Sequence, residues 1–378
     1  MTTMASLLSL PPEICSSIID NVNTSLAPLC RVSHSFRDQA QRKMYHSVDL
    51  RDCSMRLVVQ SWCLAVTRSP HLADRVWALI LQLPNPLEPK DAEILSRAFA
   101  LCVNLKRLAV HHVPGCAPED NSQHWIIKGP FHLECFFSTY FSMAYTVVLD
   151  HQTHIRVLSV PYASSSATSY DKLEFPNLTA IDAPLDIVRR VSEANAARPL
   201  ERIQIHHDRS TPDLSSLSRF APTLKALTIV REGTLPGSTF LTVVDEVLKV
   251  FPRLQHFGIH EKERQGFATV HDSLIQRLQQ FTSLTTLSLH LCRWVPFLEP
   301  RGTGFWSIQN RRQLREFGTR ILAFCTTLWK ATVVVQLARS SGEQEEIACT
   351  VSKERDGSVS AIFDDELEED SFYAMIFD

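Results

Sequence analysis

The sequence predicts an α/β protein in which units of one helix and one short strand follow a small helical segment. Two observations predict this class. A short apolar phrase returns along most of the chain, and helical stretches precede several of its copies. Before the first copy, residues 10–44 carry the apolar spacing of three short amphipathic helices.

The first predicted helix begins at Leu10-Pro11-Pro12-Glu13-Ile14. Proline is tolerated in a first helical turn, because the N–H that it lacks has no partner there. Apolar residues then recur at Ile14, Ile18 and Val22, which is helical spacing. We therefore expect a helix that ends near residues 21–23.

Two further helices are expected before residue 45. One is predicted from Ser25, a possible N-cap, to Phe36, with Leu29, Val32 and Phe36 on one face. A short third helix follows over residues 37–44, and residues 45–50 alternate polar and apolar as in a strand. So small a domain buries little surface by itself, which favours docking onto a partner or onto the rest of the chain.

The repeated phrase is Leu-x-x-Leu-x-Leu with aliphatic variants. Its copies, some of them degenerate, begin at Val76, Leu105, Leu133, Ile155, Leu178, Leu200, Leu224, Leu254, Leu284 and Leu328. From Ile155 to Leu284 the separations lie close to the 20–29 residues of leucine-rich repeats. One such unit cannot bury its own apolar edge, so stacking of units is expected.

Helices and breaks fit between these copies. Helical stretches are predicted over residues 91–101, 187–197, 241–250 and 274–281. Proline stands just before several strands, at Pro176, Pro199, Pro222 and Pro252, where it stops a helix. We interpret residues 51–340 as an irregular leucine-rich-repeat-like solenoid with parallel strands on its concave face. The alternative is an ordinary α/β domain whose strands share a spacing.

The C-terminal part has a different pattern. Residues 346–352 and 359–363 alternate around a turn signal at Asp356-Gly357, which predicts an antiparallel hairpin over residues 341–363 that caps the last repeat. Residues 364–378 contain seven acidic residues and no Lys or Arg. This acidic tail is interpreted as solvated, although four late apolar residues would also allow it to dock.

The N-terminal residues resemble the F-box family. The resemblance covers residues 6–50 and rests on Leu10-Pro11-Pro12-Glu13-Ile14, on Ile18-Ile19, on Leu29 to Ser33 and on Phe36-Arg37. Together with the repeats, the chain is similar to fungal-type F-box proteins. This pattern is a diffuse apolar one and contains no catalytic residues.

The resemblance implies a function and partners. F-box modules bind a Skp-type adaptor, which joins a cullin–RING ubiquitin ligase, and the rest of the chain selects the protein substrate. The adaptor-binding residues that it implies are Leu10, Pro11, Ile14, Ile18, Leu29, Val32 and Phe36. The alternative is a leucine-rich-repeat interaction scaffold with no link to a ligase, whose first helices only cap the repeats.

Composition and motifs argue against several other classes. The net charge is −3, so no strong field for nucleic acid or an anionic membrane is expected. No charged signal-peptide start and no apolar stretch of membrane-spanning length is visible, so we expect a cytoplasmic or nuclear protein. None of the ten cysteines forms a CxxC pair, and no catalytic phrase of hydrolases, nucleotide-binding or metal enzymes occurs. We expect neither enzyme activity nor a metal or cofactor.

Four histidines occupy the same position in the repeats. His111, His206, His260 and His290 each follow the last apolar residue of a phrase. Residues between and just after the core positions should project from the concave sheet surface. These histidines are therefore predicted to be exposed, either as solvated residues at the strand ends or as one row of a substrate-binding face.

Overall fold

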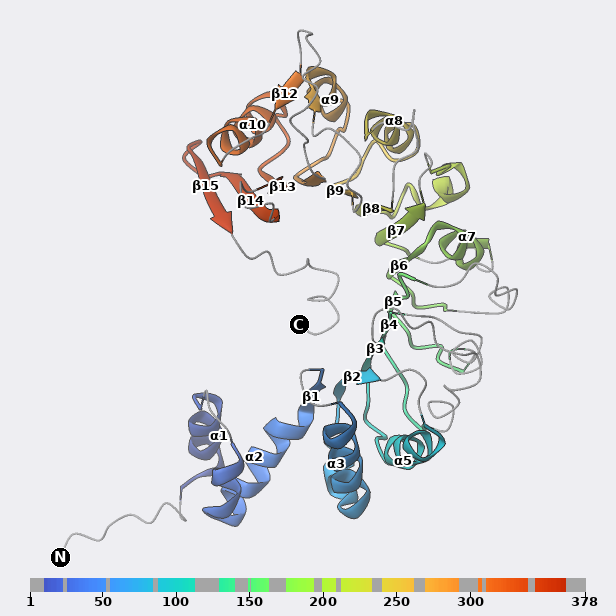
Figure 1. Ribbon diagram of the computed structural model, residues 1–378, viewed down its shortest axis with the longest axis vertical. Coiled ribbons are helices and arrows are strands. Elements are labelled where there is room, and N and C mark those ends of the chain that lie inside the picture. Colours follow the sequence, from blue (N-terminus) through green and yellow to red (C-terminus); the bar gives the residue numbers. More distant parts are fainter. Residues whose placement is uncertain are drawn as a thin grey trace, which may run out of the picture. The chain divides into compact units, whose positions relative to one another are not determined.

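The structure, a computed structural model, shows an α/β protein (Figure 1). It describes residues 10–22, 26–51, 55–83, 88–112, 129–139, 149, 151–162, 175–193, 199–208, 212–232, 240–261, 269–291, 305–307, 311–338 and 344–364. Within these residues, thirteen strands form a mostly parallel open sheet in the order β1-β2-β3-β4-β5-β6-β7-β8-β9-β11-β13-β14-β15. The chain divides into two compact units, one ending at Ile155 and the other beginning at Arg156.

Three helical segments open the first unit: α1 (Pro12–Asp20), the 3-10 helix η2 (Ala27–Arg31) and α2 (His34–His46). Helix α1 starts with proline and carries Glu13 in its first turn, beside the positive end of the helix dipole. The helix ends at Asp20, and the side-chain amide of Asn21 donates a hydrogen bond to the Ser17 carbonyl at 2.8 Å. The first predicted helix is confirmed.

The prediction of a continuous helix from residue 25 to residue 36 is wrong. Ser33 adopts an extended backbone, and its hydroxyl accepts a hydrogen bond from the Phe36 amide at 3.2 Å. This is an N-cap, so a new helix begins at His34 and absorbs the predicted third helix. The proposed cap Ser25 lies outside the described residues.

The strands of the first unit are β1 (Ser47–Leu50), β2 (Ala78–Leu83), β3 (Arg107–His112) and β4 (Cys135–Ser138), all paired in parallel. Its other helices are α3 (Met55–Arg68), α4 (Pro70–Ala73) and α5 (Pro89–Phe99). Helix α3, which the sequence analysis did not identify, packs against α5 and the first two strands. The predicted boundary after residue 50 therefore follows a strand that is already paired in this unit.

The second unit continues the parallel pattern with β5 (Val157–Ser159), β6 (Ala180–Pro184), β7 (Arg202–Asp208), β8 (Ala226–Glu232), β9 (His256–Glu261), β11 (Thr286–Leu291) and β13 (Lys330–Ala338). Between the strands lie α7 (Leu185–Glu193), the 3-10 helix η5 (Ser215–Phe220), α8 (Phe240–Val250), α9 (Asp272–Leu278) and α10 (Arg311–Phe324). In this unit α7, α8, α9 and α10 lie on one side of the strands (Figure 1).

The repeated phrase forms the core between strands and helices. Its three positions are buried in every complete copy that the structure describes; Leu227 and Ile229, for example, are 0% exposed. The same positions align from strand to strand, since Ile203 pairs with Leu227 and Leu227 with Phe257. The predicted core register is therefore confirmed, and every second residue of a strand projects to the other face.

The C-terminal hairpin is confirmed as well. Strands β14 (Gln344–Lys353) and β15 (Val359–Asp364) pair antiparallel, and β14 pairs antiparallel with β13. Gly357 has a φ of 84°, a left-handed conformation that glycine adopts without strain. A separate antiparallel pair joins β10 (Thr269–His271) to β12 (Phe305–Ser307). Residues 365–378 of the acidic tail lie outside the described residues.

A membrane-spanning helix is not found: none in the described part of the chain is long and apolar enough to cross a bilayer.

Candidate binding face

The second unit carries a polar face on the sheet surface away from α7–α10. Three rows of residues cross it, each aligned by the strand pairing. The first row is Arg202, Ala226, His256, Thr286 and Lys330; the second is Gln204, Thr228, Gly258, Ser288 and Thr332; the third is His206, Val230, His260, His290 and Val334. The rows alternate with the buried core positions, as the twofold period of a strand requires.

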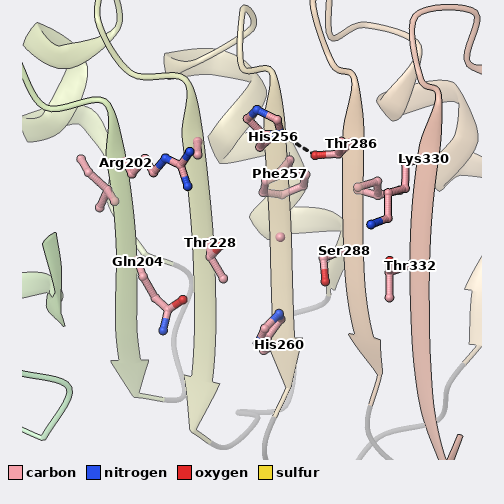
Figure 2. A pocket seen from close by; sticks show the side chains of 14 residues that line it. Arg202, Gln204, Thr228, His256, Phe257, His260, Thr286, Ser288, Lys330 and Thr332 are labelled. Atoms are coloured by element: carbon pink, nitrogen blue, oxygen red, sulfur yellow. Dashed lines mark hydrogen bonds between the residues drawn. The ribbon is translucent and has the colours of Figure 1, made fainter. Parts of the chain in front are cut away.

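A groove of about 280 Å³ lies over the first two rows. Figure 2 shows its side chains: Arg202 and Gln204 project from β7, Thr228 from β8, His256 and His260 from β9, Ser288 from β11, and Lys330 and Thr332 from β13. Among the residues that line it, the charged ones are Arg202 and Lys330, both positive. The remaining polar groups are hydroxyls, one amide and imidazoles.

Gly258 forms the floor of this groove. A Cβ atom at this position would come within 3.0 Å of the Thr228 hydroxyl oxygen and 3.2 Å of its methyl carbon. The absence of a side chain at the centre of the second row therefore opens space between Thr228 and Ser288, where a ligand can approach the backbone closely.

His256 links two strands at one end of the groove. Its Nδ1 atom lies within hydrogen-bonding distance of the Thr286 hydroxyl (Figure 2). Burial lowers the pKa of the His256 imidazole, and the positive charge of Arg202 lowers it further. A neutral imidazole carries one donor and one acceptor, so it hydrogen-bonds a ligand without adding a full charge.

His206 lies in the predicted register, but the prediction that it is exposed is wrong. Its side chain is 8% exposed, and its Nε2 atom lies 2.8 Å from Asp182 Oδ1. The other carboxylate oxygen, Oδ2, accepts a hydrogen bond from the Ser159 hydroxyl at 2.7 Å. Asp182 sits on the neighbouring strand β6, and the ring of Tyr162 lies 5.9 Å from the imidazole. His206 is therefore part of a buried polar cluster.

His260 and His290 match the prediction more closely. Both lie on the third row and are partly exposed, with ring centroids 5.6 Å apart in an edge-on arrangement. His290 Nε2 lies 3.5 Å from a carboxylate oxygen of Glu346 on β14. Of the four predicted histidines, these two are the partly exposed ones on the polar face, which also carries His256.

His111 belongs to the first unit, so it is described apart from the other three. It lies near Asp49 and Arg51, and its ring centroid is 4.8 Å from that of Phe137. Burial lowers the pKa of this imidazole to about 4, and the charge of Arg51 acts in the same direction. His111 is accordingly a neutral residue that contributes to the packing of the first unit.

The predicted adaptor-binding residues separate into two groups. Phe36 is 2% exposed and packs with Cys15, Ile19 and Ala40 inside the helical segment, while Leu10 and Leu29 are half-buried against that cluster. Ile14, Ile18 and Val32 are 47%, 37% and 43% exposed, and Pro11 is also exposed. The exposed group is called the aliphatic stripe below.

The contacts of the Ser159–Asp182–His206 cluster and of the buried thiols limit the reactivity of these groups. Ser159 donates to Asp182 and not to His206, so this cluster does not activate a serine as a Ser–His–Asp triad would. Burial raises the pKa of the Cys63 and Cys102 thiols to about 12, which keeps them unreactive. No group of His, Cys, Asp and Glu that could hold a metal ion is found in the part of the chain that is described.

The sequence analysis did not single out the other groove residues, although a signal was present. Thr228 and Ser288 each stand between two core positions of the repeated phrase, and Gln204 does so as well. Their register already assigns them to the open face of the sheet. Arg202 and Lys330 begin their strands, where the phrase holds no apolar position.

Comparison with known proteins gives no relative: neither the protein-family models nor the sequences of curated proteins match this chain.

Proposed function

We propose that this protein is the substrate-recognition subunit of an SCF-type ubiquitin ligase. In this proposal α1, η2 and α2 bind a Skp-type adaptor and, through it, a cullin–RING ligase in the cytoplasm or nucleus. The polar face of the second unit binds the protein substrate. The chain performs no chemistry; it raises the effective concentration of a substrate lysine near the conjugating enzyme.

The observation that carries the proposal is the aliphatic stripe. Ile14 and Ile18 lie one turn apart on α1, and with Val32 they leave three large aliphatic side chains in water. The three helical segments already have an internal cluster around Ile19 and Phe36, so the stripe is not needed for that packing. Exposed apolar residues one turn apart on a small helix, such as Ile14 and Ile18, are typical of surfaces that dock onto partner helices.

The F-box resemblance and the burial pattern support different roles for the implied residues. Ile14, Ile18 and Val32 would contact the adaptor directly, with the exposed Pro11 beside them. Phe36 would act from within, since its ring holds α1 and α2 together. Leu10 and Leu29 are half-buried against the internal cluster, so each would pack against it on one side and contact the adaptor on the other.

The test is capture of a purified Skp-type adaptor by the full chain. Ile14→Glu with Ile18→Glu should abolish capture, because it places two charges in an apolar interface. Leu10→Ala with Pro11→Ala should also abolish it. Thermal unfolding of the Ile14→Glu, Ile18→Glu variant should stay close to that of the native chain, since exposed positions contribute little to stability. Leu10 is half-buried against the internal cluster, so its truncation lowers stability and the two glutamate substitutions are the decisive variant.

A matched control comes from helix α3. Leu57 and Leu64 are 67% and 45% exposed, so Leu57→Glu with Leu64→Glu introduces the same charges on another exposed apolar face. This control should capture the adaptor normally. Capture that is absent in the native chain, or unchanged by the substitutions in the stripe, would exclude the ligase proposal.

One observation favours the scaffold alternative. Strand β1 follows α2 directly and pairs with β2 at the edge of the sheet. The N-terminal helices are therefore continuous with the first unit, as a cap of a repeat array would be. A scaffold would keep its ligand binding while failing to capture the adaptor, so the same experiment distinguishes the two functions.

A further inference from the structure

The groove on the polar face has the charge and the hydrogen-bonding groups to bind a partner segment that carries carboxylates. Arg202 and Lys330 are both cationic and both exposed, and no Asp or Glu is among the described residues that line the groove. Between the two cations lie Thr228, Ser288 and Thr332, whose hydroxyls donate to carboxylate or backbone oxygens (Figure 2). Positive groups at both ends, with neutral donors between them, are complementary to an acidic partner.

The positive charge of Arg202 acts inside the groove. Arg202 lies on β7, and His256 lies on the same row two strand steps away. Burial lowers the pKa of the His256 imidazole, and the charge of Arg202 lowers it further. The guanidinium that acts on this imidazole acts equally on an anion placed between them, so the β7 end of the groove attracts negative charge.

The carboxylates beside the groove have partners outside it. The pairs are Glu201 with Lys225, Asp182 with His206, and Glu346 with His290. None of these carboxylates is among the residues that line the groove. An anionic ligand in the groove therefore meets cations and neutral donors.

The spacing of the two cations suits an extended chain that crosses the strands. Arg202 on β7 and Lys330 on β13 belong to the same row and are separated by four strand steps. At about 4.8 Å for each step this is roughly 19 Å, the length of about six extended residues. Gly258 lies on β9, midway between the two strands, where the floor without a side chain lets the backbone of a ligand approach.

We propose that this groove binds an extended, acidic segment of the protein substrate. Two carboxylates about six residues apart contact Arg202 and Lys330, and the backbone between them passes over Gly258. The inference names the class of substrate and in that respect rests on the proposed function. Binding of such a segment is measured without the adaptor, so the groove and the ligase function are tested separately.

The experiment uses the full chain and three synthetic peptides of about twelve residues, each with a photoreactive benzoylphenylalanine at its centre. One peptide carries two glutamates about six residues apart, the second carries two adjacent glutamates, and the third carries two lysines at the spaced positions. Their other residues are Gly, Ser and Thr. The peptides are irradiated with the protein at about 50 mM salt, where screening is weak, and mass spectrometry locates and quantifies the labelled residues.

The spaced glutamate peptide should label the chain around Gly258. Its labelling should exceed that of the adjacent glutamate peptide at least about threefold, because only the spaced carboxylates reach both cations. The lysine peptide should give little labelling there, since it brings like charges together.

Charge substitutions in the groove identify the site. Arg202→Gln with Lys330→Gln should lower labelling by the spaced glutamate peptide at least about fivefold. Arg202→Glu with Lys330→Glu should reverse the preference, so that the lysine peptide labels the groove. Lys249→Glu with Arg253→Glu is the matched control and should be labelled as the native chain is, since both residues are exposed and neither lines the groove.

The proposal is overturned by equal labelling with spaced and adjacent glutamates, by labels that map outside the groove, or by labelling that survives both pairs of groove substitutions. The groove variants should still capture the Skp-type adaptor. Labelling of the groove in a chain that captures no adaptor would support this inference and exclude the ligase function. Adaptor capture without labelling would exclude the acidic segment and leave the ligase function standing.

Discussion

The Nε2 atom of His206 lies 2.8 Å from Oδ1 of Asp182, and both side chains are buried on the strand face opposite the helices. Ser159 completes the cluster from the next strand, with its hydroxyl 2.7 Å from Oδ2. Three strands, β5, β6 and β7, are thus joined by side chains as well as by their backbone pairing. A buried carboxylate is tolerated here because both of its oxygens have partners.

We predict that Asp182→Ala lowers the free energy of unfolding by roughly 2–3 kcal/mol, because two buried polar groups lose a charged partner. Ser159→Ala should cost only about 1 kcal/mol, since the contact of Asp182 with His206 remains. Urea denaturation of the two variants measures the difference. Equal and small effects would mean that the cluster is hydrated and contributes little.

The repeat register predicts a contrast between residues on the two faces of the sheet. Leu227 and Leu287 are 0% and 2% exposed, so truncating either to Ala should cost about 2–5 kcal/mol through lost burial and an unfilled cavity. His260→Ala on the open face should change stability by less than about 0.5 kcal/mol. Denaturant midpoints of the three variants provide the measurement. A large loss for His260→Ala would contradict its assignment to an open, partly exposed row.

The repeated phrase predicted the core and the parallel strands, and the alternation around Asp356-Gly357 predicted the C-terminal hairpin. Both predictions were possible because burial of every second strand residue produces a regular apolar pattern in the sequence. This pattern could not predict the burial of His206. The burial of His206 depends on its contact with Asp182, which lies 24 positions earlier in the sequence. The two residues come together only when β6 and β7 pair. The break at Ser33 has a local cause: the apolar spacing of Leu29, Val32 and Phe36 continues through it, although the Ser33 hydroxyl caps the start of a new helix.

The groove was predictable only in part. His260, one of its lining residues, follows from the register. The shape of the groove depends on Gly258, whose missing side chain matters because Thr228 lies beside it on β8. Thr228 and Gly258 are 30 residues apart in the sequence, so no short sequence pattern predicts that they lie side by side. Arg202 and Lys330, the cations at the two ends of the groove, are the first residues of their strands. Only the strand pairing shows that they belong to one row.

The first unit should show a pH dependence that arises from His111. Burial and the charge of Arg51 lower the pKa of this imidazole to about 4, whereas its ordinary value is 6.5. Between these values the unfolded chain takes up the proton and the folded chain does not, so stability is retained above pH 6.5 and is lost as the pH falls toward 4.

The measurement compares urea midpoints at pH 7 and pH 5 for the native chain and for His111→Gln, whose side chain takes up no proton. The fall in midpoint between the two pH values should be smaller in the variant. Asp49 contributes to the background in both proteins: burial raises its pKa, but hydrogen bonds and the charge of Arg51 outweigh burial and lower it. An identical fall in both proteins would contradict the assignment to His111.

Gly318 sets the distance between α10 and the C-terminal hairpin. It lies on the buried side of the helix with Leu314, Phe317 and Ile321. A Cβ atom there would come within 2.6 Å of a methyl carbon of Val351 on β14. Helix propensity alone favours alanine over glycine by about 1 kcal/mol, but overpacking at a buried contact costs about 1–3 kcal/mol. We therefore predict that Gly318→Ala destabilises the chain.

The pair of residues can be tested as a double-mutant cycle, because the predicted cost arises from one contact. Val351→Ala alone should be destabilising, since it removes two methyl groups from a fully buried side chain. Combined with Gly318→Ala, it removes the clash, so the double variant should be more stable than the sum of the single effects implies, with a coupling of about 0.5–3 kcal/mol. Additive effects would show that the helix shifts away from the hairpin at little cost and that Gly318 does not control the packing distance.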